Sequence, residues 1–204
     1  TYQEELKDIP PVYGITRPAQ TWNPIKINFQ HLWLLIKDAW RTESWKDKLR
    51  IWLMPTGWRP RDVEEKYPVY KIDDVYHFKK YNPALSKELM IWNWIQLVVL
   101  LVCISYLFAN IAAIGIPGIF LYGLFVFLHV YAFTDLADRN VSAIISEAIK
   151  DAYGLALIFN QHDWFGAGKF VPYISPILTG YFIISFLITT WFAVKHRKED
   201  SVVV

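Results

Sequence analysis

Two long apolar runs lie near the middle of the chain and are separated by only four residues. Leu89 to Ala109 has 21 residues with three polar ones, and Ile114 to Phe133 has 20 residues with no formal charge. A helix rises about 1.5 Å per residue, so each run can cross about 30 Å of hydrocarbon. The pattern therefore predicts a transmembrane hairpin. The alternative is two helices buried in a soluble core, but a chain of 204 residues has little other apolar surface to enclose them.

Two further apolar runs follow the hairpin. The stretch from Val141 to Phe159 is mostly apolar but carries Glu147, Lys150 and Asp151, whereas Val171 to Val194 has 24 uncharged residues. Basic residues flank these runs unevenly. Lysines and arginines at positions 79, 80, 87, 139, 195, 197 and 198 fall on one side if the chain crosses four times, and only Lys169 falls opposite. The positive-inside rule thus predicts four crossings with both ends cytoplasmic.

The third run contains a candidate charge pair within the membrane. Glu147 and Lys150 are three residues apart, which brings their side chains together on one helical face. An ionisable group at membrane depth is costly unless it is paired or faces a cavity. We interpret the pair as a structural contact turned into the bundle, with a place beside a substrate path as the alternative.

The N-terminal part divides into three segments. Residues 1–24 form an extended strap interrupted by prolines, and residues 25–53 carry amphipathic helices. Helix 25–41 begins after Asn23-Pro24 and repeats apolar residues at steps of three and four, and Ser44 with Asp47 caps a second short helix. Tryptophan mixed with lysine and arginine is typical of the membrane interface, but the apolar stripe equally suits a soluble partner domain. The apolar positions of the longer helix are Phe29, Leu32, Trp33, Ile36 and Trp40.

Residues 54–88 are predicted to be a polar cytoplasmic loop region, followed by four transmembrane helices in 89–195 and a cytoplasmic tail in 196–204. Pro55, Gly57 and Pro60 predict a tight turn that presents Trp58 and Arg59. These two residues are candidates for contact with a lipid headgroup or a partner carboxylate, although a purely structural role is favoured. A single histidine, His77, beside Asp73 and Asp74 fits a solvated loop better than a metal site.

Composition supports a membrane protein without its own active site. Hydrophobic residues make up 54% of the chain and aromatic residues 17%, and the net charge of +2 gives no reason to expect nucleic acid as a partner. The one cysteine, Cys103, lies inside an apolar run, where a nucleophile is not expected. The five histidines are scattered, with the closest pair 33 positions apart. We therefore assign no catalytic residue and no metal ligand to this chain.

The stretch LMPTGWRPRDVEEKYP (53–68) resembles the region that follows the catalytic core in the fatty acid hydroxylase and sterol desaturase superfamily. The segments TYQEEL, PVYGITRP and TWNP near the start are similar to the exit from that core. The Asp138-Arg139 turn and the Ser146-Glu147 pair with Lys150 resemble the C-terminal membrane region of the alkylglycerol monooxygenase branch of this superfamily. Within that superfamily, we expect the chain to be most similar to bacterial sterol-desaturase-like proteins related to alkylglycerol monooxygenase.

The resemblance implies a lipid hydroxylase or desaturase with a di-iron centre held by histidine boxes, embedded in the bacterial inner membrane or the endoplasmic reticulum. Because this chain lacks those boxes and begins at Thr1, we expect it to be a C-terminal fragment. Di-iron is then expected in the parent protein and no cofactor in this chain. The expected partners are the lipid bilayer, the upstream catalytic half and a lipid substrate. The alternative is a stand-alone membrane interaction or scaffold module with no enzymatic role.

Overall fold

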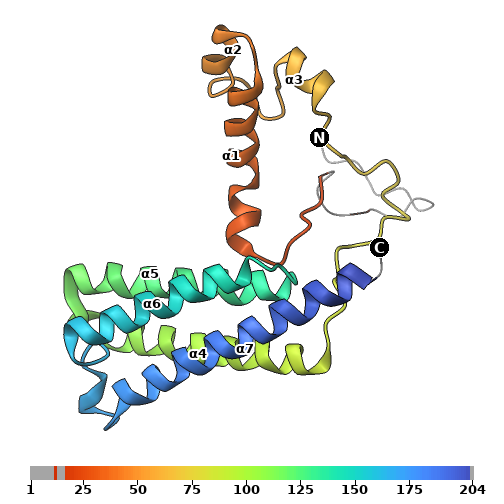
Figure 1. Ribbon diagram of the computed structural model, residues 1–204. Helices are drawn as coiled ribbons and strands as arrows, with labels where there is room; N and C mark the ends of the chain where they lie inside the picture. The colour runs from red at the N-terminus through yellow and green to blue at the C-terminus, as the bar shows by residue number, and fades with distance from the viewer. Residues whose placement is uncertain (1–11, 13–16, 203–204) are drawn as a thin grey trace. The chain divides into compact units, whose positions relative to one another are not determined.

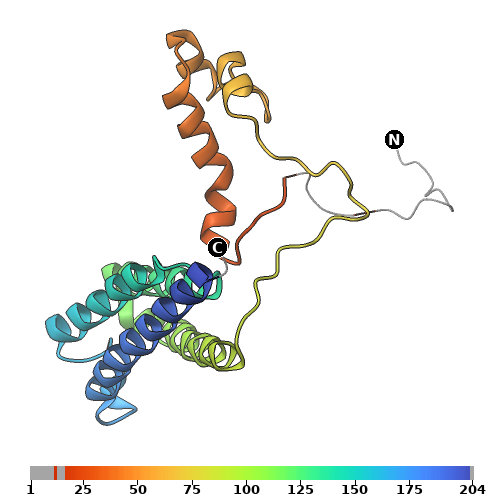
Figure 2. The same ribbon diagram turned by 45° about the vertical axis from the view of Figure 1, so that its right-hand side comes forward.

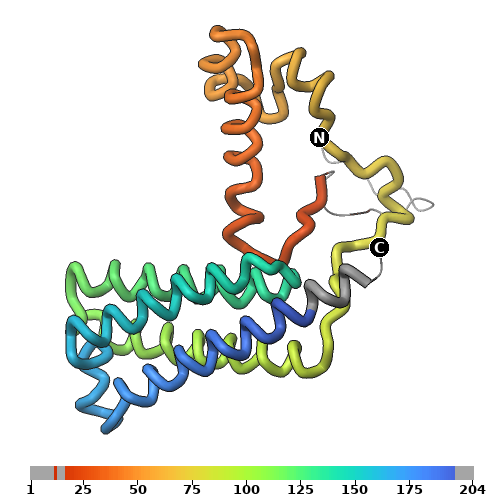
Figure 3. The backbone as a smooth tube through the Cα atoms, viewed as in Figure 1, coloured from red at the N-terminus to blue at the C-terminus, as the bar shows by residue number. Residues whose placement is uncertain are grey.

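The computed structural model describes residue 12 and residues 17–202, with side chains up to Lys195 (Figure 3). Within these residues all regular structure is helical, which confirms the predicted all-α membrane fold. The chain divides into two compact units, one built mainly from residues up to Asn82 and one from Pro83 onward, with residues 22–24 joining the second. The elements are α1 (Pro24–Arg41), α2 (Trp45–Arg50), α3 (Arg61–Lys66), α4 (Lys87–Ala109), α5 (Ile111–Ala137), α6 (Ala143–Gln161), the 3-10 helix η1 (Ala167–Lys169) and α7 (Ile174–Val202).

Helices α4 to α7 run up and down beside one another as an antiparallel bundle (Figures 1 and 2). Each helix packs against the next in sequence, and α7 also contacts α5 and η1. Within the described part of the chain, three segments are long and apolar enough to cross a membrane: Lys87–Ala109, Ile111–Ala137 and Ile174–Lys195. Helix α6 is not one of them, although its 19 residues extend about 28 Å. The prediction of a fourth crossing therefore stays a prediction.

The bundle places large apolar side chains on its outer surface. Trp94, Val102 and Phe108 on α4 and Phe120 on α5 are each more than half exposed. Water would penalise such a surface, whereas lipid chains make favourable contact with it. The interior contains a compact aromatic core, in which Tyr122, Phe125, Trp164 and Phe182 are almost fully buried. This distribution agrees with an integral membrane protein.

The link between the first two membrane helices is shorter than expected. The sequence pattern left Asn110 to Ala113 between the runs, but α5 already begins at Ile111. Gly115 and Ile116 then interrupt the helical backbone, and Gly115 has a φ of +61° that glycine tolerates best. The last predicted run also begins later than its apolar pattern, since α7 starts at Ile174.

The N-terminal unit carries three helices. Helix α1 begins at Pro24, as the sequence predicts, and the Ser44 hydroxyl accepts a hydrogen bond of 3.3 Å from the Asp47 amide at the start of α2. The polar region after residue 54 contains a short helix, α3, that the pattern did not reveal. Its acidic first turn complements the helix N-terminus, and Val63 anchors it by burial. The apolar stripe of α1 remains exposed within the described residues.

Candidate functional site

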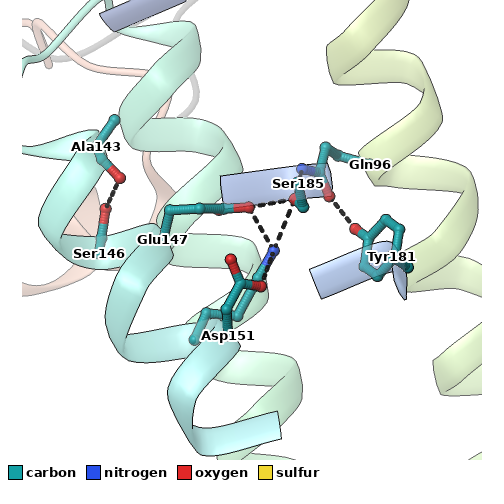
Figure 4. A network of polar contacts seen from close by, with 8 residues as sticks. Gln96, Ala143, Ser146, Glu147, Asp151, Tyr181 and Ser185 are labelled. Atoms are coloured by element: carbon teal, nitrogen blue, oxygen red, sulfur yellow. Dashed lines mark hydrogen bonds and ion pairs between the residues drawn. The ribbon is translucent and has the colours of Figure 1, made fainter. Parts of the chain in front are cut away.

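A buried polar cluster lies inside the bundle, and its charged members all lie on one face of α6. Glu147, Lys150, Asp151 and Gly154 recur at steps of three and four residues, and all four are buried. The Glu147 and Asp151 side chains project from the same face of α6 (Figure 4), and both Glu147 and Lys150 form hydrogen bonds with Ser185 on α7. The charged residues that make this segment unusual in sequence are therefore buried inside the bundle and do not face its outer surface.

Lys150 is the centre of the cluster. Its Nζ lies 2.6 Å from Glu147 Oε1 and 3.1 Å from Asp151 Oδ1, and it donates to Ser185 Oγ over 3.2 Å. The same ammonium lies 5.4 Å from the centroid of the Tyr181 ring. One cation thus faces two carboxylates, so the group carries a formal charge of −1 when all three ionise. In an apolar bundle such a charge is expensive unless hydrogen bonds stabilise it.

Side chains from α4 and α7 provide those hydrogen bonds. The Ser185 hydroxyl donates to Glu147 Oε1, and Gln96 Nε2 donates to Ser185 Oγ over 2.7 Å. The Tyr181 hydroxyl in turn donates to Gln96 Oε1. The network therefore joins α4, α6 and α7 (Figure 4), and its members are almost completely buried except for Tyr181, which is half-buried. Sequence analysis did not name Ser185 or Tyr181; a polar or amphipathic residue inside an apolar run was the only available indication.

His129 on α5 extends the cluster with an unusual feature. Its side chain is fully buried, yet neither ring nitrogen has a hydrogen-bond partner among the described residues. The ring stacks on Tyr181 with centroids 6.4 Å apart and an interplanar angle of 18°. Phe125 and Phe133 meet it edge-on. Its surroundings are thus mainly aromatic, and its position beside Tyr181 could not be deduced from spacing.

A close approach of α6 and α7 encloses the cluster from one side. A Cβ atom added at Gly154 would lie 2.5 Å from Phe182 Cζ, well inside van der Waals contact. Only glycine allows Phe182 to lie against the backbone of α6 at this point. Gly154 follows Asp151 by three residues, so this contact supports the same face of the helix that carries the charges.

A separate apolar cavity of about 380 Å³ lies among α4, α5, η1 and α7. Tyr122 marks its inner wall, where the hydroxyl donates to the Cys103 carbonyl over 2.8 Å and accepts from Trp164 Nε1 over 3.1 Å. Because these polar groups bind one another, the cavity presents an apolar lining. Such a lining suits an alkyl chain better than a polar ligand.

The predicted contact residues Trp58 and Arg59 lie in the N-terminal unit. Arg59 donates to both oxygens of Asp38, over 2.6 and 2.9 Å, and to the Tyr67 carbonyl over 2.8 Å. The hydrogen bonds to Asp38 hold the pKa of the Arg59 guanidinium above its ordinary value. The carboxylate that Arg59 meets is thus in its own chain. The Arg50 guanidinium lies over the Trp58 ring, with Arg50 Cζ 5.4 Å from the ring centroid. Contact of either residue with a lipid or partner stays a prediction.

Within the described residues, no three histidine, cysteine, aspartate or glutamate side chains come together in a group that could hold a metal ion. His77 Nδ1 lies 2.6 Å from Asp74 Oδ2 in an exposed loop, and this contact lowers the pKa of the Asp74 carboxyl. The carboxylates of the buried cluster are already bound by Lys150. The donor set of the described residues does not fit a di-iron centre, which needs several clustered ligands.

Comparison with known proteins identifies relatives by sequence, including proteins from human and Xenopus tropicalis. The chain is distantly similar to alkylglycerol monooxygenase. Against the human protein, identity is 24% over 203 residues, which covers 98% of this chain and 43% of the relative. Against the Xenopus tropicalis protein, identity is 22% over 166 residues, which covers 81% of this chain and 36% of the relative. No family model and no solved structure matches. The chain thus spans less than half the length of the curated relatives it matches.

Proposed function

We propose that this chain is the C-terminal membrane module of a lipid-modifying monooxygenase of the sterol desaturase and fatty acid hydroxylase superfamily. The observation that carries the proposal is the similarity to alkylglycerol monooxygenase over 98% of this chain but only 43% of the human protein. Three apolar helices long enough to cross a membrane support the same assignment. In this proposal the chain anchors and completes the enzyme without holding its catalytic iron.

The division of labour follows from the chemistry of the described residues. A di-iron centre would activate O₂ in the parent protein, and its ligands would come from an upstream catalytic half. This chain would contribute the membrane anchor and an apolar wall for the lipid. The cavity beside Tyr122 and Trp164 has a lining suited to an alkyl chain, and the cluster around Lys150 would hold the surrounding helices together. The parent protein would lie in the bacterial inner membrane, or in the endoplasmic reticulum of a eukaryote.

The size of the native product tests this proposal. Immunodetection and mass spectrometry of the protein in its own membranes should reveal a product larger than 24.0 kDa with histidine boxes upstream of Thr1. The isolated 204-residue chain, purified in detergent, should bind no stoichiometric iron and hydroxylate no alkylglycerol. A native product of 24.0 kDa, or one or two tightly bound irons per isolated chain, would contradict the proposal. The smaller product would favour a stand-alone membrane interaction module.

A further inference from the structure

The N-terminal unit contains a cavity of about 600 Å³ whose charged lining residues are all basic. Its walls come from α1, from the segment before α1, and from the stretch that runs from Arg59 through the end of α3 to Tyr70. The described lining includes no aspartate or glutamate. The five basic residues are Arg17, Lys37, Arg41, Arg59 and Lys66. Because pockets of this volume enclose small ligands, the charge distribution points to an anion.

One face of α1 provides the floor of the cavity. Gln30, Leu34, Lys37 and Arg41 follow at steps of four, three and four residues, which is the spacing of a single helical face. This face lies beside the exposed apolar stripe, on which Trp33 and Trp40 are 57% and 85% exposed. Helix α1 thus carries a basic face and an aromatic face next to each other. That combination is typical of segments at the membrane surface.

Two of the five cations already have acidic partners. Arg59 binds Asp38, and Lys66 Nζ lies 3.0 Å from Glu43 Oε1. Both contacts raise the pKa of the basic group, so the two side chains stay charged. Arg59 also donates to the Tyr67 carbonyl and thereby ties the far wall to α1. These two ion pairs therefore stabilise the walls of the cavity, and we do not count their cations as free to bind a ligand.

The other three cations have no carboxylate partner among the described residues. The Arg41 guanidinium lies 4.1 Å from the centroid of the Tyr67 ring, and Lys37 Nζ lies 5.4 Å from that of Trp33. Stacking on an aromatic ring holds a cation in place but leaves its charge uncompensated. Arg17 faces the same cavity from the segment before α1. Three uncompensated cations around one cavity form a site for a multiply charged oxyanion.

We infer that the cavity bounded by Arg17, Lys37 and Arg41 binds a phosphate group. Arginine offers a planar fork of N–H donors that matches phosphate oxygens, and lysine adds a mobile point charge. The phosphate has two sources with the same chemistry: the headgroup of an anionic phospholipid, and a soluble phosphate ester. This site is independent of the proposed oxygenase function, and it would be present in a chain that catalyses nothing.

Calorimetric titration of the full 204-residue chain in dodecyl maltoside micelles tests the site. The probes are glycerol 3-phosphate, dihexanoyl phosphatidic acid and, as the zwitterionic control, dihexanoyl phosphatidylcholine. Binding of phosphatidic acid alone would identify the lipid headgroup as the source, and comparable binding of glycerol 3-phosphate would identify the soluble ester. Both results support the phosphate site. No saturable binding of either probe, or equal binding of phosphatidylcholine, would overturn it.

Charge variants make the test specific for the cavity. Lys37→Gln and Arg41→Gln should each weaken binding about tenfold, because each removes one charged donor. Lys46→Gln is the matched control, since Lys46 is exposed on α2, outside the cavity, and carries the same charge. Lys37 is also exposed, so its substitution keeps the test valid if Arg41→Gln disturbs the fold. An equal loss of binding in Lys46→Gln would mean adsorption by net charge and would refute the site.

Discussion

At the scale of single residues, the described structure keeps several charges out of water. Asp38 is fully buried against Arg59, and Lys150 is fully buried among Glu147, Asp151 and Ser185. Burying a charged pair often adds little net stability, but removing one partner leaves an uncompensated charge. A single substitution that removes one charge of a buried pair should therefore lower the free energy of unfolding more than a combined substitution that removes both charges.

Lys150→Met should be the most destabilising change in the bundle. It leaves two buried carboxylates without their cation and should cost about 3–5 kcal/mol. The triple variant Glu147→Gln, Lys150→Met, Asp151→Asn removes every charge together and should recover most of that loss. Glu147→Gln with Lys150→Met should recover less, because Asp151 stays buried beside no cation. Thermal unfolding in detergent measures these three variants together with the single variants Glu147→Gln and Asp151→Asn. Losses that add up across the single and combined variants would show that these residues do not interact.

Asp62 predicts a pH dependence in the N-terminal unit. The Glu43 amide donates to its carboxylate over 2.9 Å and the Thr42 hydroxyl over 3.1 Å, and these bonds lower the pKa of the Asp62 carboxyl. A lowered pKa in the folded state means that the stabilisation is present above the unfolded value of about 3.9 and is lost as the pH falls through the folded value. The Glu43 amide resonance should therefore titrate below about pH 4 in NMR spectra. In a Glu43→Gln background, which removes the carboxyl group of the observed residue itself, Asp62→Asn should abolish that titration. Glu65→Gln, which changes an exposed carboxylate of α3, should leave it unchanged.

At the scale of elements, side-chain size decides how closely helices approach. Helix α6 carries its charges on the face that meets α7, and Gly154 on that face admits the ring of Phe182. The charged cluster and the close contact thus depend on the same helix orientation. A change that separates α6 from α7 would expose polar groups to lipid, where they have no alternative partners.

Gly154→Ala should destabilise the bundle by about 1–3 kcal/mol, because the new methyl group overlaps Phe182. Gly123→Ala on α5 is the matched control, since nothing lies within 4 Å of the position its Cβ would take. In that open position alanine should be neutral or stabilise the helix by up to about 1 kcal/mol. Thermal unfolding of the two variants in the same detergent compares them. Equal melting temperatures would mean that α6 and α7 do not approach as closely as described.

At the scale of the whole molecule, the antiparallel order of the bundle bears on its orientation. Helix α4 begins and α7 ends at one end of the bundle, and the α5–α6 turn lies there too (Figure 1). That end includes Lys87, Arg139 and Lys195, whereas the 3-10 helix with Lys169 lies at the other end. If α6 crosses the membrane, the positive-inside rule places the first group in the cytoplasm.

Reporter fusions at Lys87, Arg139, Lys169 and the C-terminus should therefore locate only Lys169 outside the cytoplasm. This result would establish four crossings with both ends cytoplasmic. Opposite locations for Lys87 and the C-terminus would mean three crossings, with α6 lying along the membrane surface. Three charged residues in α6 make it the segment on which the outcome depends.

The sequence alone determined the all-helical membrane fold, because apolar runs of 20 or more residues have few other stable environments. It also predicted the start of α1 at Pro24 and the cap at Ser44, since these depend on local backbone chemistry. The short helix α3 could not be predicted from the sequence, because six residues are too few to show a periodic pattern.

Tertiary structure decided which residues meet across the bundle. Spacing could pair Glu147 with Lys150, but Gln96, Tyr181 and Ser185 form hydrogen bonds with residues 35 to 89 positions away. The same holds for Arg59 in the segment before α3, whose partner Asp38 is 21 residues distant and belongs to α1. Sequence periodicity reports only the face of one helix, whereas these contacts depend on how separate helices pack. The basic cavity arises in the same way, because its cations converge only after α1 and its flanking segments fold together.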